Sequence, residues 1–191
     1  MRNEATRKVY DYWLRIKGDR SAPLRSEIDP TALRRLLPYL FILTPGAEGA
    51  PEFRLAGTRI CEIFGRELRG AAFSGLWDGD PDPAEIARDV MRLEQPAILD
   101  GRTRNGETAI GFEVLLLPLR SGETADRLLG SFLPQASPAP PVTRPLSGLS
   151  LQGWNFLEAD REPASSSTDD PGPARALLRF LSTRLLDNGT T

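Results

Sequence analysis

The sequence predicts an α+β protein with five strands, two in a first hairpin and three in a later meander, and with helices before and between them. Three patterns predict it: apolar residues recur at helical spacing over 4–17, "EFRLAG" alternates apolar and polar residues, and Asn105-Gly106 separates two strand-like runs. Asn-Gly favours a tight hairpin because both central residues of a type I′ turn need positive φ. The predicted order is one helix, two strands, several short helices, a longer helix and three meandering strands.

The first helix is expected over Glu4–Lys17, with Gly18 just after its end. Its apolar face forms a stripe of four residues, Val9, Tyr10, Trp13 and Ile16. Such a stripe should not remain in water. Either the chain's own sheet or a second copy of the chain covers it, and a homodimer is the interpretation that we favour.

A short helix is expected next, with Asp29 as its N-cap and Pro30 at the first helical position. This helix would turn Leu33, Leu36 and Leu37 inward. A hairpin follows over 39–55, in which strand alternation places Phe53 and Leu55 on the same face.

The segment "FRLAGTRICEIFGRELRGAAFSGLW" contains four glycines, at positions 57, 65, 70 and 75. Their spacing matches no phosphate-binding loop, so we interpret them as sharp turns between short helices. A longer helix is expected from Pro83, capped by Asp82, with Ile86, Val90 and Leu93 turned inward.

Three strands are expected over 97–104, 107–117 and 125–134. In the second of them Ile110, Phe112, Val114 and Leu116 share one face. Eight of the 17 prolines lie from Pro134 to Pro173, which indicates an extended linker. The predicted organisation is an N-terminal helix (1–20), a sheet domain (21–136), a proline-rich linker (137–174) that Trp154, Phe156 and Leu157 anchor, and a C-terminal helix (175–191).

Composition excludes several function classes. The chain has no histidine, so Ser-His-Asp and Cys-His catalysis and imidazole-bound zinc or haem are excluded. Interspersed charges with a net charge of −2 argue against a nucleic-acid partner. The longest apolar stretch, 36–43, is too short to span a membrane, and the N-terminus lacks a secretory signal, so we expect a cytoplasmic protein. We expect no catalytic residue, no metal and no cofactor.

One group of residues is a candidate small-molecule pocket between the helices and the sheet: Ile60, Phe64, Phe73, Trp77, Ile86, Val90, Phe112 and Val114. The alternative is a filled core, and the sequence leaves both open.

Other polar residues have simpler interpretations. Arg54, Arg59 and Arg66 either hold an anionic ligand or are surface residues paired with Glu62 and Glu67, and we favour the second. Cys61, the single cysteine, is either a redox-sensitive thiol or, as we favour, a buried structural residue. Glu113 is expected to face solvent or an arginine.

The order of elements resembles a PAS domain. The stretches "DYWLRI", "LRSEIDPTALRRLLPYLFIL" and "FRLAGTRICEIFGRELRGAAFSGLW" are similar to a bacterial family of stand-alone PAS-like proteins, and the resemblance covers Val9 to Pro134. It implies a five-stranded antiparallel sheet with its connecting helices over one face, and a sensory or regulatory role. It also implies dimers through the entering helix, which PAS-like domains commonly use. "TRICEIF" around Cys61 differs from the Asn-Cys-Arg-Phe motif of flavin-photoreceptor PAS domains, so no photochemical adduct is expected.

The sequence therefore predicts a regulatory module that binds a protein partner, with a small-molecule ligand as a further expectation. Two alternatives stay open. One is a small α+β enzyme or carrier that acts on a small organic ligand, and the other is a structural dimer whose C-terminal tail docks on a larger assembly.

Overall fold

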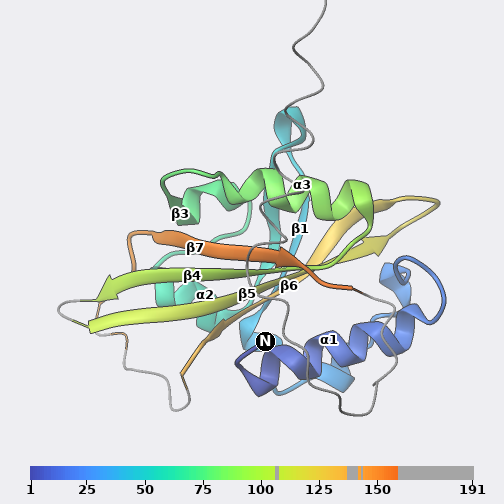
Figure 1. The fold of residues 1–191 in the computed structure, drawn as a ribbon, viewed down its shortest axis with the longest axis horizontal. Helices are drawn as coiled ribbons and strands as arrows, with labels where there is room; N and C mark the ends of the chain where they lie inside the picture. Colours follow the sequence, from blue (N-terminus) through green and yellow to red (C-terminus); the bar gives the residue numbers. More distant parts are fainter. Residues whose placement is uncertain (106–107, 137–141, 143, 159–191) are drawn as a thin grey trace, which may run out of the picture. The chain divides into compact units, whose positions relative to one another are not determined.

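Seven strands form a mixed sheet in the computed structural model, which describes residues 1–105, 108–136, 142 and 144–158. The strands lie in the order β2-β1-β6-β5-β4-β7-β3 (Figure 1). Their bounds are β1 Leu40–Pro45, β2 Pro51–Ala56, β3 Trp77–Asp78, β4 Ala97–Asn105, β5 Thr108–Arg120, β6 Ala125–Pro134 and β7 Leu149–Phe156. Neighbouring strands are antiparallel, except that β3 and β7 are parallel.

The prediction of five strands was therefore incomplete. β3 has only two residues, which is too short for an alternation pattern. β7 lies inside the segment 137–174 that we interpreted as a linker, and it pairs with β4 from Ala97↔Phe156 to Arg102↔Ser150. The prolines that suggested a linker flank this strand and do not interrupt it. The predicted helix over 175–191 lies outside the described residues.

Among the described residues three α-helices accompany the sheet: α1 Glu4–Lys17, α2 Thr58–Phe64 and α3 Pro83–Leu93. The predictions for α1 and for the start of α3 are confirmed, and both helices begin with a side-chain cap, but the expectation that Leu93 turns inward was wrong, because it is 46% exposed. Asn3 accepts from the Ala5 N–H at 2.8 Å, and Asp82 accepts from the Ala84 N–H at 2.9 Å. α2 ends at Gly65, whose φ of 63° gives the left-handed conformation that favours glycine.

Five short 3₁₀ helices complete the described structure: η1 Arg25–Glu27, η2 Pro30–Leu33, η3 Leu37–Tyr39, η4 Ala47–Gly49 and η5 Phe73–Leu76. η2 begins at Pro30 as predicted, but it stops after four residues. Leu33 is buried, whereas Leu37 starts the next turn and is 39% exposed, so the expectation that Leu37 points inward was wrong.

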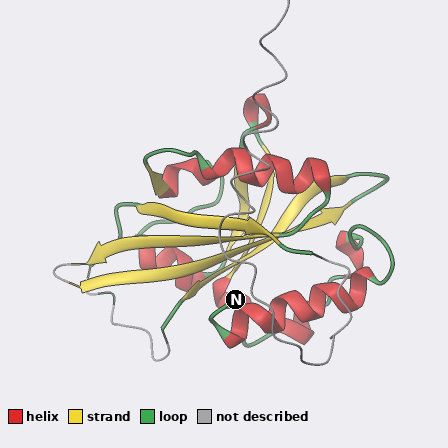
Figure 2. Ribbon diagram, viewed as in Figure 1, coloured by secondary structure: helices red, strands yellow, loops and turns green. Residues whose placement is uncertain are grey.

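The sheet is covered on both faces (Figure 2). One buried cluster joins α2, α3 and η5 to strand residues that include Phe112, Val114 and Leu116, which confirms their predicted shared face. A second cluster joins α1 and the connection that holds η1–η3 to Leu115, Leu117 and Leu119. Helices on both faces explain the uninterrupted apolar run of β5, because both of its faces are buried. The expectation of helices on one face alone was thus too simple.

A β-bulge in β2 changes the face of the sheet to which its following side chains point. In β1 the adjacent residues Ile42 and Leu43 pair with Leu55 and Phe53 of β2. Arg54, between these two partners, has no partner of its own in β1 and is therefore an extra residue in β2. Phe53 therefore joins the first cluster, while Leu55 lies opposite Ile42, which packs against the second cluster. The prediction that Phe53 and Leu55 share a face was wrong for this reason.

The hairpin of β4 and β5 is confirmed as an antiparallel pair. Asn105 does not occupy a central turn position, because it pairs with Thr108 and ends β4.

At one border of the sheet, the backbone on the outer side of β2 is partly hydrogen-bonded: the Phe53 N–H donates to the Ala71 carbonyl at 3.0 Å, and the Gly70 N–H donates to the Phe53 carbonyl at 2.8 Å.

Candidate functional site

The eight residues of the predicted pocket come together in the first buried cluster. α2 supplies Ile60 and Phe64, η5 supplies Phe73, β3 supplies Trp77, α3 supplies Ile86 and Val90, and β5 supplies Phe112 and Val114. All are at most 4% exposed except Trp77, which is half-buried against the cluster. The sequence thus identified which residues meet between the helices and the sheet.

Aromatic rings occupy the space between these residues. Phe132 on β6 lies 4.6 Å from Phe112 and 5.6 Å from Phe64, measured between ring centroids. Phe73 lies 5.9 Å from Trp77. These separations are those of rings in direct contact, so a ligand could enter only if the rings moved. The sequence analysis missed Phe132, although alternation along "LLGSFLP" places it on the same face as Leu128 and Gly130.

Trp77 is the polar residue at the border of this cluster. Its Nε1 atom is buried and has no hydrogen-bond partner among the described residues. Its ring lies over β4 at Gly101, where an added Cβ would meet the ring at 3.1 Å. A buried indole N–H without an acceptor is unfavourable, and an acceptor atom on a ligand would satisfy it.

The stripe of α1 lies on the chain's own sheet. Val9 and Trp13 are fully buried and Tyr10 is 8% exposed, while Ile16 is half-buried. The Trp13 indole N–H donates to the Pro118 carbonyl on β5 at 2.9 Å. Of the two alternatives left open by the sequence, coverage by the same chain is what the structure shows for this stripe.

Glu113 fixes the beginning of α1. Its carboxylate, which is 1% exposed, accepts from the backbone N–H groups of Arg2 and Asn3, the latter at 2.8 Å. The Asn3 side-chain amide also donates to the Pro134 carbonyl at 2.6 Å. The expectation that Glu113 faces solvent was wrong, because α1 covers this face, and the arginine it meets, Arg2, bonds to it through the backbone N–H.

A basic groove has α1 on one side and the segment 31–36, which contains most of η2, on the other. It has a volume of about 600 Å³. Its apolar part is formed by Ala5, Ala32, Leu33 and Leu36, and its charged residues are Lys8, Asp11, Arg15, Arg34 and Arg35. Lys8 pairs with Glu4 at 2.8 Å. In the described part of the chain, no ion pair joins Arg15, Arg34 or Arg35 to a carboxylate.

An apolar cleft lies on the other side of the same connection, against the sheet. It has a volume of about 570 Å³, and its lining includes the buried residues Leu33, Leu40, Leu119 and Leu129. Its sides include Ile28, Pro30, Leu37, Ile42 and Leu55, and its polar side chains are Arg25 and Ser26. Neither the cleft nor the groove was found from the sequence, because both depend on the path of the connection between α1 and β1.

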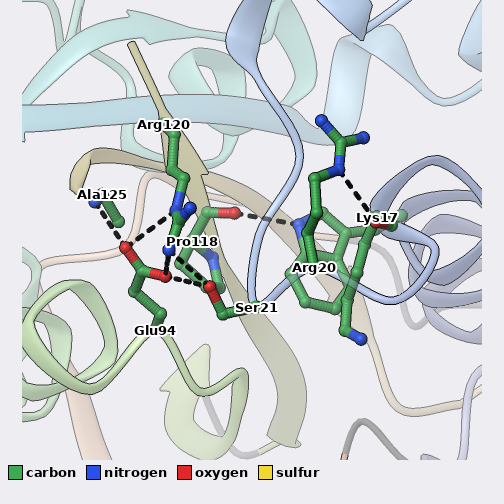
Figure 3. A network of polar contacts seen from close by, with 8 residues as sticks. Lys17, Arg20, Ser21, Glu94, Pro118, Arg120 and Ala125 are labelled. Atoms are coloured by element: carbon green, nitrogen blue, oxygen red, sulfur yellow. Dashed lines mark hydrogen bonds and ion pairs between the residues drawn. The ribbon is translucent and has the colours of Figure 1, made fainter. Parts of the chain in front are cut away.

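A polar network at one end of the sheet joins α3, the α1–β1 connection and the β5–β6 turn. Figure 3 shows the Glu94 carboxylate facing Arg120, Ser21 and the Ala125 backbone. The Arg120 Nε atom lies 3.0 Å from each Glu94 oxygen, and the Ala125 N–H donates to Glu94 at 2.8 Å. The Arg120 backbone N–H also donates to the Pro23 carbonyl at 3.0 Å.

The pKa of the Glu94 carboxyl is lower than its usual value. Burial acts to raise it, but the hydrogen bonds from Arg120, Ser21 and Ala125 favour the charged form and outweigh burial. The network therefore holds Glu94 as a carboxylate at neutral pH.

The remaining candidates behave as surface or structural residues. Arg59 pairs with Glu62 at 2.5 Å, and both are exposed. Arg66 donates to the Gly75 carbonyl at 3.1 Å. The pKa of the half-buried Cys61 thiol is raised, chiefly by burial, which disfavours the reactive thiolate. No group of residues in the described ranges forms a metal site, and none of the described helices has the length and apolarity that crossing a membrane requires.

Comparison with known proteins gives one family. A model of the PAS_5 family, described as a PAS domain, matches residues 1–133. No curated protein matches the chain. Among solved structures, that of a light-oxygen-voltage domain studied with a flavin analogue is 17% identical, with a TM-score of 0.43, over 55% of this chain and 82% of that chain.

Proposed function

The chain belongs to the PAS_5 family of PAS domains, and from this premise we propose that it is a sensory or regulatory module that acts by binding a protein partner. PAS domains are typically sensory or signalling modules and usually non-catalytic. The observation that carries the proposal is the basic groove between α1 and η2. It combines an apolar floor with three arginines that make no ion pair among the described residues.

The chemistry of the groove defines the partner segment. An apolar floor takes apolar side chains, and guanidinium groups on the rim offer bidentate hydrogen bonds to carboxylates. The partner is therefore an acidic segment with one apolar face. Association should be fast at low salt and should slow as salt screens the arginines.

Charge reversal tests this proposal. Arg34→Glu together with Arg35→Glu places two negative charges on the rim of the groove, whereas Arg88→Glu with Arg92→Glu makes the same change on the exposed side of α3. Affinity capture from the source cell with the full chain should yield a protein that wild type and the α3 variant retain and the groove variant loses. The captured protein, once purified, should bind wild type directly and more weakly as salt rises. Equal capture by the groove variant would contradict the proposal.

A small molecule between the helices and the sheet is the second part of the proposal. The buried Nε1 of Trp77, which has no partner among the described residues, supports it because a ligand acceptor there would complete its hydrogen bonding. Native mass spectrometry of the protein from its source should then show a bound small molecule. Trp77→Phe keeps a ring but removes the donor, and it should lower the bound fraction. A ligand-free wild type would contradict this part alone.

A further inference from the structure

We propose that the apolar cleft between the α1–β1 connection and strands β1 and β2 is a binding site for an anionic amphiphile, a molecule with an apolar chain and one carboxylate. This site lies on the sheet face that α1 covers, opposite the helix–sheet core. It shares Leu33 with the partner groove, but its other lining residues are different, and none of the residues beside Trp77 belongs to it.

The first argument is the size and lining of the cleft. Its volume of about 570 Å³ falls within the range of small-molecule pockets. Buried leucines, further aliphatic side chains and Phe41 make up nearly all of its lining. Such a lining disfavours a polar ligand, because it offers few hydrogen bonds to the polar groups that would be buried there. It favours an alkyl chain, which needs none.

The second argument is the exposure of leucines at the mouth of the cleft. Leu55 is 54% exposed and Leu37 is 39% exposed, and they are two of the four most exposed large apolar residues in the described part of the chain. The β-bulge at Arg54 is what turns Leu55 to this face. A bound alkyl chain would remove both leucines from water.

The third argument is the charge at the mouth. Arg25 and Ser26 are the polar side chains of the lining, and both are exposed residues of η1. The adjacent Glu27 is already engaged, because it pairs with Arg20 at 2.9 Å and accepts from the Leu24 N–H at 2.7 Å. Among the described residues no carboxylate pairs with Arg25. A carboxylate at the end of the alkyl chain would be its partner.

Binding of dodecanoate to the full chain tests the proposal, measured by calorimetry below its micelle concentration. Dodecanoate should bind. Dodecanol should bind more weakly because it lacks the charge, and hexanoate should bind more weakly because its chain is shorter. Leu55→Ser and Arg25→Gln should each weaken dodecanoate binding by about tenfold. Their matched controls are Leu93→Ser, a leucine of α3 that is 46% exposed, and Arg88→Gln, and both should bind like wild type.

Two further measurements locate the ligand and its source. A dodecanoate analogue with a photoreactive group should label residues of η1–η3, β1 or β2, whereas label on Phe112 or Phe132 would assign the ligand to the core and overturn the proposal. Vesicles of phosphatidylglycerol serve as a separate arm. Binding to vesicles without binding to free dodecanoate would also overturn the proposal, and would indicate a membrane surface as the ligand. Equal dodecanoate affinity in all four variants would overturn it as well.

Discussion

At the scale of single residues, Glu94 shows how one side chain joins segments far apart in the sequence. It ends α3 in the left-handed conformation, with φ of 51°, and its carboxylate accepts from residues of the α1–β1 connection, β5 and the start of β6. Removing the carboxylate would take the acceptor from the Ala125 N–H and from the Arg120 Nε, and would leave the Arg120 side chain, among the described residues, only its bond to the Ser21 hydroxyl at 2.6 Å. Glu94 thus contributes through hydrogen bonds to the folded state and not through packing.

We predict that Glu94→Gln lowers the free energy of unfolding at pH 7 by about 1–3 kcal/mol, because the amide nitrogen cannot accept. The pKa of Glu94 is lowered in the folded protein, so its contribution is present above the unfolded pKa and disappears as pH falls through the folded pKa. Denaturant titrations from pH 7 to about pH 3 should therefore show the difference from wild type shrinking. Glu85→Gln, an exposed change on the same helix, is the control, and a difference that stays constant with pH would contradict the assignment.

The sequence analysis did not single out Glu94. Spacing can show that a helix stops, but it cannot show that Arg120 and Ser21 approach from elsewhere. The same limit applies to Glu113, whose neighbours along β5 suggested a solvent-facing charge. Its actual partners are backbone donors of Arg2 and Asn3, which only the docking of α1 brings near.

At the scale of elements, α1 is a part of the core of a single chain. Its inner residues are as buried as those of the central strands, and a hydrogen bond to β5 anchors Trp13. Periodicity predicted the bounds and the apolar face of this helix. It could not decide what covers the face, because a stripe of this kind looks the same whether sheet or partner lies against it.

Two substitutions in α1 should differ in their effect. Trp13→Ala removes a fully buried ring and should cost about 3–5 kcal/mol of unfolding free energy, whereas Ile16→Ala, at a half-buried position, should cost clearly less. Thermal and chemical unfolding measure both. If Trp13→Ala instead gave a stable protein that sedimented as a smaller species than wild type, a second chain would be its main contact.

The beginning of α1 gives a further prediction. Glu113→Gln leaves one acceptor where the carboxylate has two, so one backbone N–H of Arg2 or Asn3 loses its partner. We expect faster amide hydrogen exchange over residues 2–6 and little change in β5 or β6. Uniformly faster exchange across the sheet would show that Glu113 stabilises the whole fold and not the helix terminus.

At the scale of the whole molecule, β7 extends the folded unit beyond the predicted domain end at residue 136. Residues Met1–Ala159 form one compact unit, in which β7 lies between β4 and β3 and buries Leu149. The local sequence "LSLQGWNF" has strand character, but its pairing with β4 crosses about 50 residues, and the dense prolines on both sides obscured it. The central strands were easier to predict because each pairs with its neighbour in the chain.

Truncation should reveal this boundary. A chain that ends at Glu158 retains all seven strands, whereas a chain that ends at Ala136 lacks β7 and leaves β4 without its outer partner. We expect the shorter chain to be less stable than the 1–158 chain by at least about 3 kcal/mol, since it lacks Leu146 and Leu149 and the apolar surface that these two residues bury in the longer chain. Denaturant unfolding of both chains measures the difference. Equal stability would mean that β7 does not belong to the cooperative unit.

The hydrogen bonds from residues 70–71 to the outer side of β2 have a consequence for self-association. An open strand at the border of a sheet is a template on which other chains add strands and aggregate. Here Phe53, in the middle of β2, already has its backbone N–H and carbonyl occupied by Ala71 and Gly70, and at the opposite border β3 offers only two residues. Copies of this chain are thereby discouraged from pairing their sheets edge to edge.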